Sequence, residues 1–187
     1  SLIREYDLPK IRLSTDNIIV PLRPNGEPID EIRDEEESRI MGDAITSFIR
    51  KITEDETIRL HCSIAGGRKT MSFYLGSALQ LFGRPWDRLY HVLVTPEFEA
   101  NPQFFYKPKN DREIETILPD GTKRTLNTKD AEIYLAELPF IRLRDKVDLR
   151  ESDFTSLIER SQTELDIATY QMPLSVNLSL RTLTIGS

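Results

Sequence analysis

The chain contains few of the residues that mark several classes of site. Its 187 residues include one cysteine, Cys62, so no disulfide can form within the chain, and this fits a reducing cytoplasm. Its two histidines, His61 and His91, fall in apolar segments with no cysteine or carboxylate at ligand spacing, so we expect no metal centre. No apolar run approaches the roughly 20 residues of a membrane-spanning helix, and the sequence predicts no membrane partner.

Composition and charge narrow the partners further. A formal charge of −6 disfavours long DNA or RNA, which would need a basic face. A compact anion site is compatible with that charge, because a pocket responds to the charges and N–H groups nearest to it. Apolar residues at 39% and charged residues at 30% are typical of a soluble globular protein. We therefore expect a cytoplasmic protein with a small anionic ligand.

One segment carries the strongest functional signal. Alternating apolar residues predict a strand over 58–64, the dipeptide Gly66-Gly67 breaks it, and an amphipathic helix follows over 68–82. Glycines let the backbone turn tightly and bring its N–H groups close to a ligand. The N-terminus of the helix and the basic pair Arg68-Lys69 add positive charge. The pattern indicates a phosphate or other anion site; the plain alternative is a glycine turn with two solvated basic residues.

Known motifs do not explain this segment. Lys69-Thr70 resembles the end of a P-loop, but the two glycine positions of that motif hold Ser63 and Arg68. No G-x-G-x-x-G dinucleotide fingerprint and no G-x-S-x-G nucleophile elbow is present. Ser63 has no evident base partner, and Cys62 is expected to be a small buried hydrophobe.

Periodicity along the rest of the chain predicts an α/β fold. The expected elements up to residue 94 are a strand over 18–20, a helix over 34–53, the strand and helix at 58–82, and a strand over 89–94. This alternation is typical of a doubly wound, mainly parallel sheet, whose ligands bind beyond the carboxyl ends of the strands. The acidic run at 34–37 is expected to be a solvated helix N-terminus.

The second half has a different pattern. A turn at 119–122 predicts a hairpin, and a strand, a helix and a last hairpin are expected over 131–138, 152–165 and 174–185. We therefore expect a core domain over 1–108 and a β-rich C-terminal extension over 109–187 that covers or extends it.

Several segments together resemble CRISPR-associated Rossmann-fold (CARF) proteins of the ring-nuclease-like group. The resemblance covers roughly residues 1–185 and lies in segments 28–33, 63–71, 79–85, 87–89, 91–94, 104–108 and 136–144. It implies a Rossmann-like core that binds cyclic oligoadenylate, above all the four-membered ring, made by type III CRISPR systems. Family members begin with a strand, a Ser- or Thr-bearing loop and a helix that precede the part resembling Ser1 to Tyr6, so we expect an N-terminally incomplete chain.

The resemblance also implies a reaction. In the family, the ribose 2′-OH attacks the adjacent phosphorus without a metal or cofactor, which leaves a 2′,3′-cyclic phosphate and a free 5′-OH. Lys69 would stabilise the charge at phosphorus, and Arg68 would either clamp a phosphate or pair with an acidic neighbour. Ser63 would bond a ribose or phosphate, with a buried strand serine as the alternative. The expected ligand-binding residues are Ser63, Ala65, Gly66, Gly67, Arg68, Lys69 and Thr70.

Three functions fit this pattern. The chain is a ring nuclease, a non-catalytic sensor that regulates a separate effector module, or an acidic scaffold that binds protein only. The pocket residues are the same for the first two. A ring with repeated phosphates also suggests a homodimer that places two copies of the site around one ligand.

Overall fold

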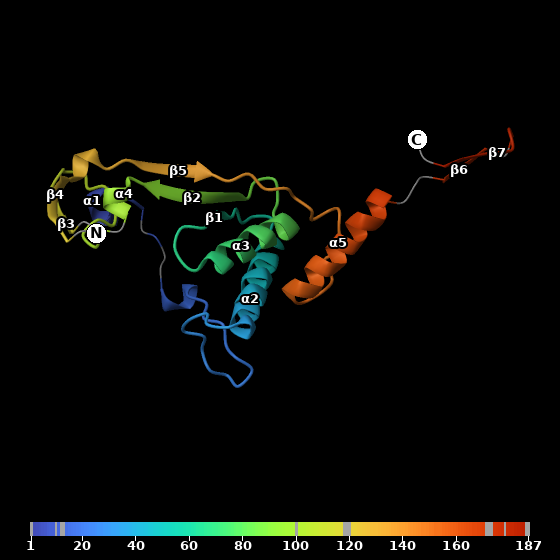
Figure 1. The fold of residues 1–187 in the computed structure, drawn as a ribbon, viewed down its shortest axis with the longest axis horizontal. Coiled ribbons are helices and arrows are strands. Elements are labelled where there is room, and N and C mark those ends of the chain that lie inside the picture. The colour runs from blue at the N-terminus through green and yellow to red at the C-terminus, as the bar shows by residue number, and fades with distance from the viewer. Residues whose placement is uncertain are drawn as a thin grey trace. The chain divides into compact units, whose positions relative to one another are not determined.

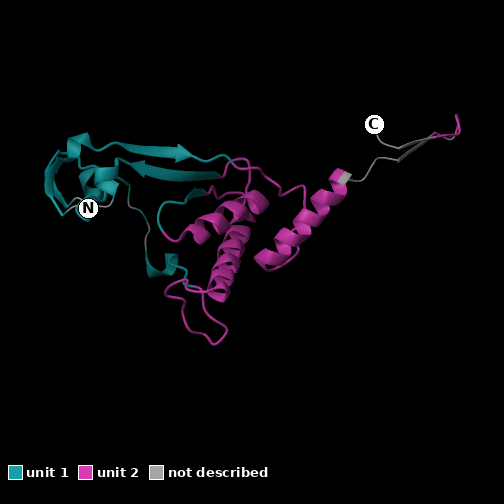
Figure 2. Ribbon diagram, viewed as in Figure 1, with its two compact units in different colours: residues 1–20, 61–66, 88–139 teal, residues 21–60, 67–87, 140–187 magenta. Residues whose placement is uncertain are grey.

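The computed structural model describes residues 2–9, 11, 14–99, 101–117, 121–170, 174–177 and 179–185. The chain divides into two compact units that are built from interleaved segments (Figure 2). Unit 1 contains residues 1–20, 61–66 and 88–139, and unit 2 contains residues 21–60, 67–87 and 140–187. The predicted domain division at residue 108 stays a prediction.

Unit 1 is built on a three-stranded sheet with the order β1-β2-β5 (Figure 1). The strands are β1 (His61–Ser63), β2 (Arg88–Val94) and β5 (Ile133–Glu137). β1 pairs parallel with β2, and β5 pairs antiparallel with β2. The mixed α/β class is therefore confirmed, but the described sheet is mixed rather than mainly parallel. The reason is that β5 pairs with β2 directly, in the opposite direction, instead of entering the sheet by a further helical crossover.

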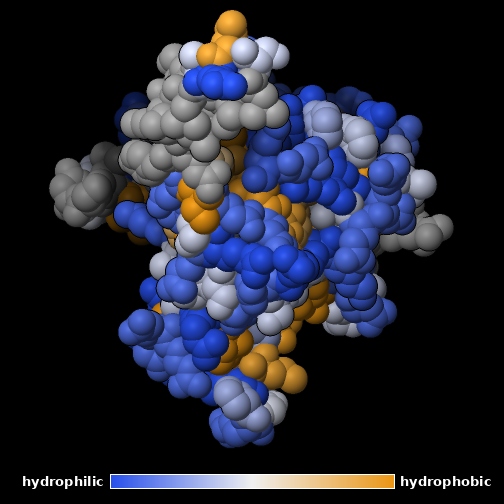
Figure 3. Space-filling model, turned by 90° about the vertical axis from the view of Figure 1, so that its right-hand side faces the viewer, coloured by the Kyte–Doolittle hydropathy of each residue, from blue (hydrophilic) through white to orange (hydrophobic). Residues whose placement is uncertain are grey.

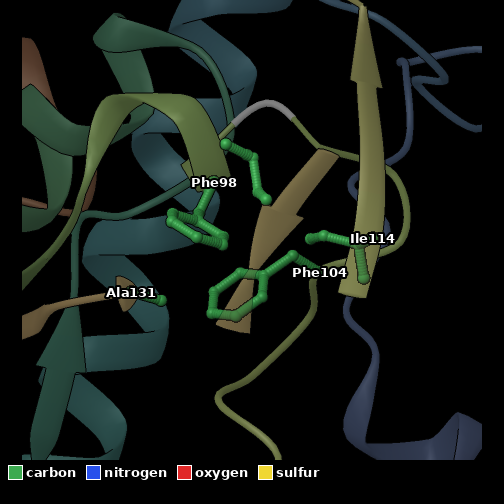
Figure 4. Close-up of a cluster of buried hydrophobic side chains, with 5 residues drawn as sticks. Phe98, Phe104, Ile114 and Ala131 are labelled. Carbon is green, nitrogen blue, oxygen red and sulfur yellow. The ribbon is translucent and has the colours of Figure 1, made fainter. Parts of the chain in front are cut away.

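A hairpin and a short helix complete the core of unit 1. The hairpin consists of β3 (Glu113–Ile117) and β4 (Lys123–Asn127), which pair antiparallel as predicted, and the helix is α4 (Pro96–Glu99). Buried apolar side chains from these elements and from the segments next to them pack into one cluster (Figure 4), which comprises Phe98, Phe104, Ile114, Leu126 and Ala131. The short elements α1 (Leu2–Glu5), the 3-10 turn at Thr15–Asn17 and the 3-10 turn at Thr128–Asp130 also belong to unit 1.

The strand predicted over 18–20 is wrong. Ile18, Ile19 and Val20 are exposed and form no regular element. The run is only three residues long, and Pro21 follows it without an N–H to donate to a neighbouring strand.

Unit 2 is helical around α2 (Glu35–Thr53) and α3 (Lys69–Phe82), which lie side by side (Figure 1). α5 (Phe154–Tyr170) contacts α2, and a hairpin of β6 (Leu174–Asn177) and β7 (Thr182–Ile185) follows, as predicted. The side chains of Ile49, Leu79 and Leu157, one from each helix, are fully buried. Burial of each stabilises the unit by roughly 1.5–3 kcal/mol relative to an exposed position.

The turn after α3 is held by a buried ion pair. Arg84 and Asp87 are 3% and 1% exposed, and the Asp87 Oδ2 accepts from the Arg84 Nε at 2.9 Å. Asp87 Oδ1 also accepts the backbone N–H of Leu60 at 3.0 Å. Burial raises the pKa of Asp87. Hydrogen bonds from the Arg84 guanidinium and from the backbone N–H groups of Leu60 and Arg84 outweigh this effect and leave the pKa below its usual value.

One face of the molecule shows how polar and apolar side chains are distributed on it. The face in Figure 3 is mostly hydrophilic, with apolar side chains exposed between the polar ones. Within the described residues, no helix is long and apolar enough to cross a bilayer.

Candidate anion-binding site

The end of β1 carries the first predicted site residues. Ser63 lies opposite Tyr90 of β2, and the Ile64 N–H donates to the Tyr90 carbonyl at 3.0 Å, which extends the pairing by one residue. The Ser63 hydroxyl is exposed and its Oγ accepts the Ala65 N–H at 3.1 Å. Ser63 is therefore not a buried strand serine; its oxygen closes a local turn, and its O–H can still donate to a ligand.

The two glycines adopt the backbone conformation that only glycine tolerates well. Gly66 has φ of 86° and Gly67 has φ of 71°, both in the left-handed region. A Cβ at Gly67 would also lie 3.3 Å from the Met71 Sδ, whereas the space around Gly66 is open. The chain passes from unit 1 to unit 2 between these two residues. The tight turn predicted from the dipeptide is thus confirmed.

The N-terminus of α3 follows at once. Arg68 is its N-cap residue, with extended φ and ψ of −81° and 152°, and its side chain makes no capping hydrogen bond. The first turn contains no acidic residue. The backbone N–H groups at this end therefore keep the partial positive charge of a helix N-terminus, without an acidic side chain in the first turn to offset it.

A cavity of about 630 Å³ in unit 2 opens onto this helix end. The N-terminal parts of α2 and α3 both contribute to its wall, together with the loop before α2. Its lining residues are Ile32, Arg33, Asp34, Ser38, Gly67, Arg68, Lys69 and Thr70. Four of the predicted ligand-binding residues, Gly67 to Thr70, therefore share one cavity; Ser63, Ala65 and Gly66 belong to unit 1 and remain predictions.

Lys69 and Arg68 differ in what they contact. Lys69 is exposed, and its Nζ makes no hydrogen bond or ion pair with any residue that the structure describes. Arg68 forms an ion pair with Glu31, and both side chains are about half exposed (52% and 50%). Glu31 also accepts from the Nε of Arg33 at 3.4 Å. An exposed pair of this kind contributes about 0–1 kcal/mol, so a phosphate could displace Glu31 from Arg68 at little expense.

The loop before α2 is anchored by a buried carboxylate. Glu37 is 6% exposed, forms an ion pair with Arg23 and accepts the Arg33 N–H at 2.7 Å. The hydrogen bond from Arg23, followed by that from the Arg33 N–H, holds the pKa of Glu37 below its usual value. The sequence predicts a solvated side chain for Glu37 at the start of the helix. This prediction is wrong, because the loop before α2 folds back over the Glu37 carboxylate.

Sequence reasoning missed part of the cavity. Arg33 and Ser38 come from the loop and first turns around α2, about 30 residues before the glycines, and no local pattern connects the two segments. The sequence predicts Asp34 only as part of a helix start. Asp34 does cap α2, by accepting the Glu37 N–H at 2.8 Å, and it also lines the cavity. Two signals point to Arg33: segment 28–33 is one of those that resemble CARF proteins, and the loop contributes a second arginine near the basic pair.

Metal ligands are not gathered in the part of the chain that the structure describes, where no group of three or more His, Cys, Asp or Glu side chains could hold an ion. His61 stacks on Tyr90 with ring centroids 5.8 Å apart and contacts its hydroxyl at 3.3 Å. The cavity wall itself carries the cationic side chains of Arg33, Arg68 and Lys69 and the N-terminal N–H groups of α3.

Comparison with known proteins adds a family. The model of the family described as CRISPR-associated protein NE0113 (Cas_NE0113) matches residues 1–167, which include all of unit 1, most of unit 2 and every lining residue of the cavity. Comparison with curated proteins finds no match, and comparison with solved structures finds none.

Proposed function

The chain belongs to the CRISPR-associated protein NE0113 family, and from this premise we propose that it binds cyclic oligoadenylate, above all cyclic tetra-adenylate, and opens the ring without a metal. A Rossmann-like core, with the ligand at the glycine turn, is part of the same proposal. The resemblance of segments 63–71, 79–85, 87–89, 91–94 and 104–108 to CARF ring nucleases supports the choice of ligand.

The observation that carries the proposal is the position of Lys69. Its exposed ammonium group has no partner among the described residues and stands at the first position of α3, in a cavity with Arg33 and Arg68. Three cationic side chains and an uncapped helix N-terminus provide more positive charge than two carboxylates can offset: Asp34 on the cavity wall, and Glu31, which pairs with Arg68 and Arg33. A ligand with phosphodiesters meets this charge directly.

The proposed reaction needs few protein groups. The ribose 2′-oxygen forms a bond to the adjacent phosphorus as the bond from phosphorus to the 5′-oxygen breaks, and the proton lost by the 2′-OH is balanced by one gained at the 5′-oxygen. Lys69 stabilises the additional negative charge at phosphorus and donates a proton to the leaving oxygen. Arg68 and the N–H groups after Gly67 orient the phosphate for in-line attack.

The repeated phosphates of the ring also bear on the oligomeric state of the protein. A ring with repeated phosphates offers equivalent contacts to two copies of the cavity, so we propose a homodimer around one ligand. Light scattering with bound ligand should give one ring per two chains. A monomer that binds the ring with full affinity would overturn the dimer and leave the ligand assignment intact.

The decisive experiment uses excess protein and cyclic tetra-adenylate in EDTA, with products separated by chromatography and identified by mass. Linear products that end in a 2′,3′-cyclic phosphate are expected. Lys69→Ala should lower the rate by roughly 100-fold or more, the effect of removing one preorganised stabilising group, and should weaken binding. Lys51→Ala is the matched control, because Lys51 is an exposed lysine at the opposite end of α2.

One observation favours a second candidate, a non-catalytic sensor that regulates a separate effector module. Among the described residues that line the cavity, Asp34 is the only carboxylate, and its Oδ1 accepts the Glu37 N–H in the cap of α2, so the wall offers few groups that could act as a general base. Intact ligand that co-elutes with the protein would establish the sensor and reject the nuclease. A ligand that neither binds nor changes would reject both and leave a scaffold role.

A further inference from the structure

A second cavity, of about 390 Å³, lies at the other end of the helix pair in unit 2. It is formed by residues that follow the C-terminal ends of α2 and α3 and by the segment after Phe140. Its lining residues are Glu56, Gly83, Arg84, Pro85, Trp86, Arg142, Arg144, Asp145 and Lys146. The first cavity lies at the N-terminal ends of the same helices, and the 19 residues of α2 span about 28 Å. The two cavities are therefore separate sites.

The basic residues of this cavity fall into two groups. Arg84 is engaged by Asp87, and Arg144 donates to the carbonyls of Thr53 and Phe82 at 3.1 and 3.4 Å. These two arginines neutralise the negative ends of α2 and α3. Arg142 and Lys146 are exposed, and their side chains make no hydrogen bond or ion pair with the residues that the structure describes. Two cations are thus left for a ligand.

The cavity also presents an aromatic ring. Trp86 is the only tryptophan of the chain, and the Arg84 guanidinium carbon lies 5.5 Å from its ring centroid. Because Arg84 is held by the buried ion pair with Asp87, it supports the indole from one side in a fixed position. The indole Nε1 is buried and has no hydrogen-bond acceptor among the described residues. Indole rings beside cationic side chains stack well on nucleic-acid bases.

The wall that carries the two free cations is anchored in place. The Leu143 N–H donates to the Gln80 carbonyl on α3 at 2.7 Å, and the Lys146 N–H donates to the Leu143 carbonyl at 2.8 Å. Arg144 ties the same segment to the ends of both helices. The cavity is therefore formed before any ligand binds, which limits the entropy lost on binding.

We propose that this second cavity is a nucleotide site, in which the base stacks on Trp86 and the phosphate binds Arg142 and Lys146. Glu56 and Asp145 also line the cavity and disfavour a polyanion that would run past it, so the ligand is a short nucleoside phosphate rather than a long strand. The site is independent of the ring-opening activity proposed above.

Trp86 makes the test direct, because its fluorescence reports this cavity alone. The full chain is titrated with adenosine 5′-monophosphate and, separately, with inorganic phosphate. Saturable quenching by the nucleotide is expected, and the double variant Arg142→Ala/Lys146→Ala should weaken it at least about tenfold, as expected for the loss of two charge-assisted contacts. Lys51→Ala and Lys69→Ala should leave the titration unchanged.

A second variant tests the stacking. Trp86→Ala should weaken nucleotide binding, measured by calorimetry, by roughly 5- to 100-fold, the range for loss of one stacked base, while inorganic phosphate binding stays unchanged. Circular dichroism checks that each variant is folded. Equal affinity for nucleotide and inorganic phosphate would overturn the nucleotide assignment. Binding to neither probe, or a titration unaffected by the double variant, would overturn the site itself.

Discussion

Two glycines in the helix pair of unit 2 should respond in opposite directions to the same substitution. Gly42 lies on α2 where the ring of Tyr74 from α3 packs against it, and a Cβ there would lie 2.5 Å from the Tyr74 Cε1. The ring cannot easily move away, because two contacts hold it. Its hydroxyl lies 3.2 Å from the Ser38 Oγ, and its plane is perpendicular to the ring of Phe154, with the two centroids 5.0 Å apart. Gly76 on α3 has no atom within 4 Å of the equivalent position.

The magnitudes follow from two effects. Glycine to alanine inside a helix gains roughly 0.5–1 kcal/mol because the unfolded chain loses backbone freedom. Gly76→Ala should keep that gain in full. Gly42→Ala should lose it to overpacking, which costs about 1–3 kcal/mol in a packed interface. For a chain of this size, in which 1 kcal/mol shifts the Tm by about 2–4 °C, the first variant should raise the Tm by about 1–4 °C and the second should lower it.

Thermal and urea unfolding followed by circular dichroism measure both variants under the same conditions. In a Tyr74→Ala background the clash is absent. Gly42→Ala should therefore cost less stability there than it does in the presence of the ring. If Gly42→Ala raised the Tm as much as Gly76→Ala, the packing of Tyr74 against α2 would be refuted, and with it this part of the α2–α3 interface.

Two further predictions concern charged groups of unit 2. Asp87→Asn should lower the free energy of unfolding by about 3–5 kcal/mol, because it leaves the Arg84 guanidinium buried without its counter-charge. Urea unfolding measures this change, with a substitution of an exposed aspartate, Asp111→Asn, as the control. Equal unfolding midpoints for the two variants would contradict the prediction. The pKa of Asp148 is lowered to about 2, first by the hydrogen bond from Arg150. Because the folded-state pKa lies below the unfolded value of about 4, this carboxylate stabilises the fold above pH 4, and the contribution is lost as the pH falls from about 4 to 2. Asp148→Asn should therefore show a shallower loss of Tm across that interval than the parent chain, and parallel curves would rule the effect out.

Local patterns in the sequence determined the elements and the site motif. The 3.6-residue spacing of apolar side chains located α2 and α3 to within a residue or two, because helix periodicity and end signals act over neighbouring turns. The dipeptide at residues 66–67 required the left-handed backbone that the structure contains, since glycine alone adopts it without strain. The basic pair that follows had to stand at a helix start.

Tertiary structure alone decided which of these pieces face one another. Three features depend on residues that are far apart along the chain or belong to different elements. They are the antiparallel direction of β5 against β2, the ion pair of Arg68 with Glu31, and the burial of Glu37 under a folded loop. The same holds for Trp86 and the free cations at 142 and 146, which share a cavity across more than 50 residues of sequence. Hydrophobic periodicity specifies which face of an element is buried, but not its partner, because apolar burial has no direction and many pairings satisfy one pattern. Which partners meet is settled only when the whole set of elements packs together.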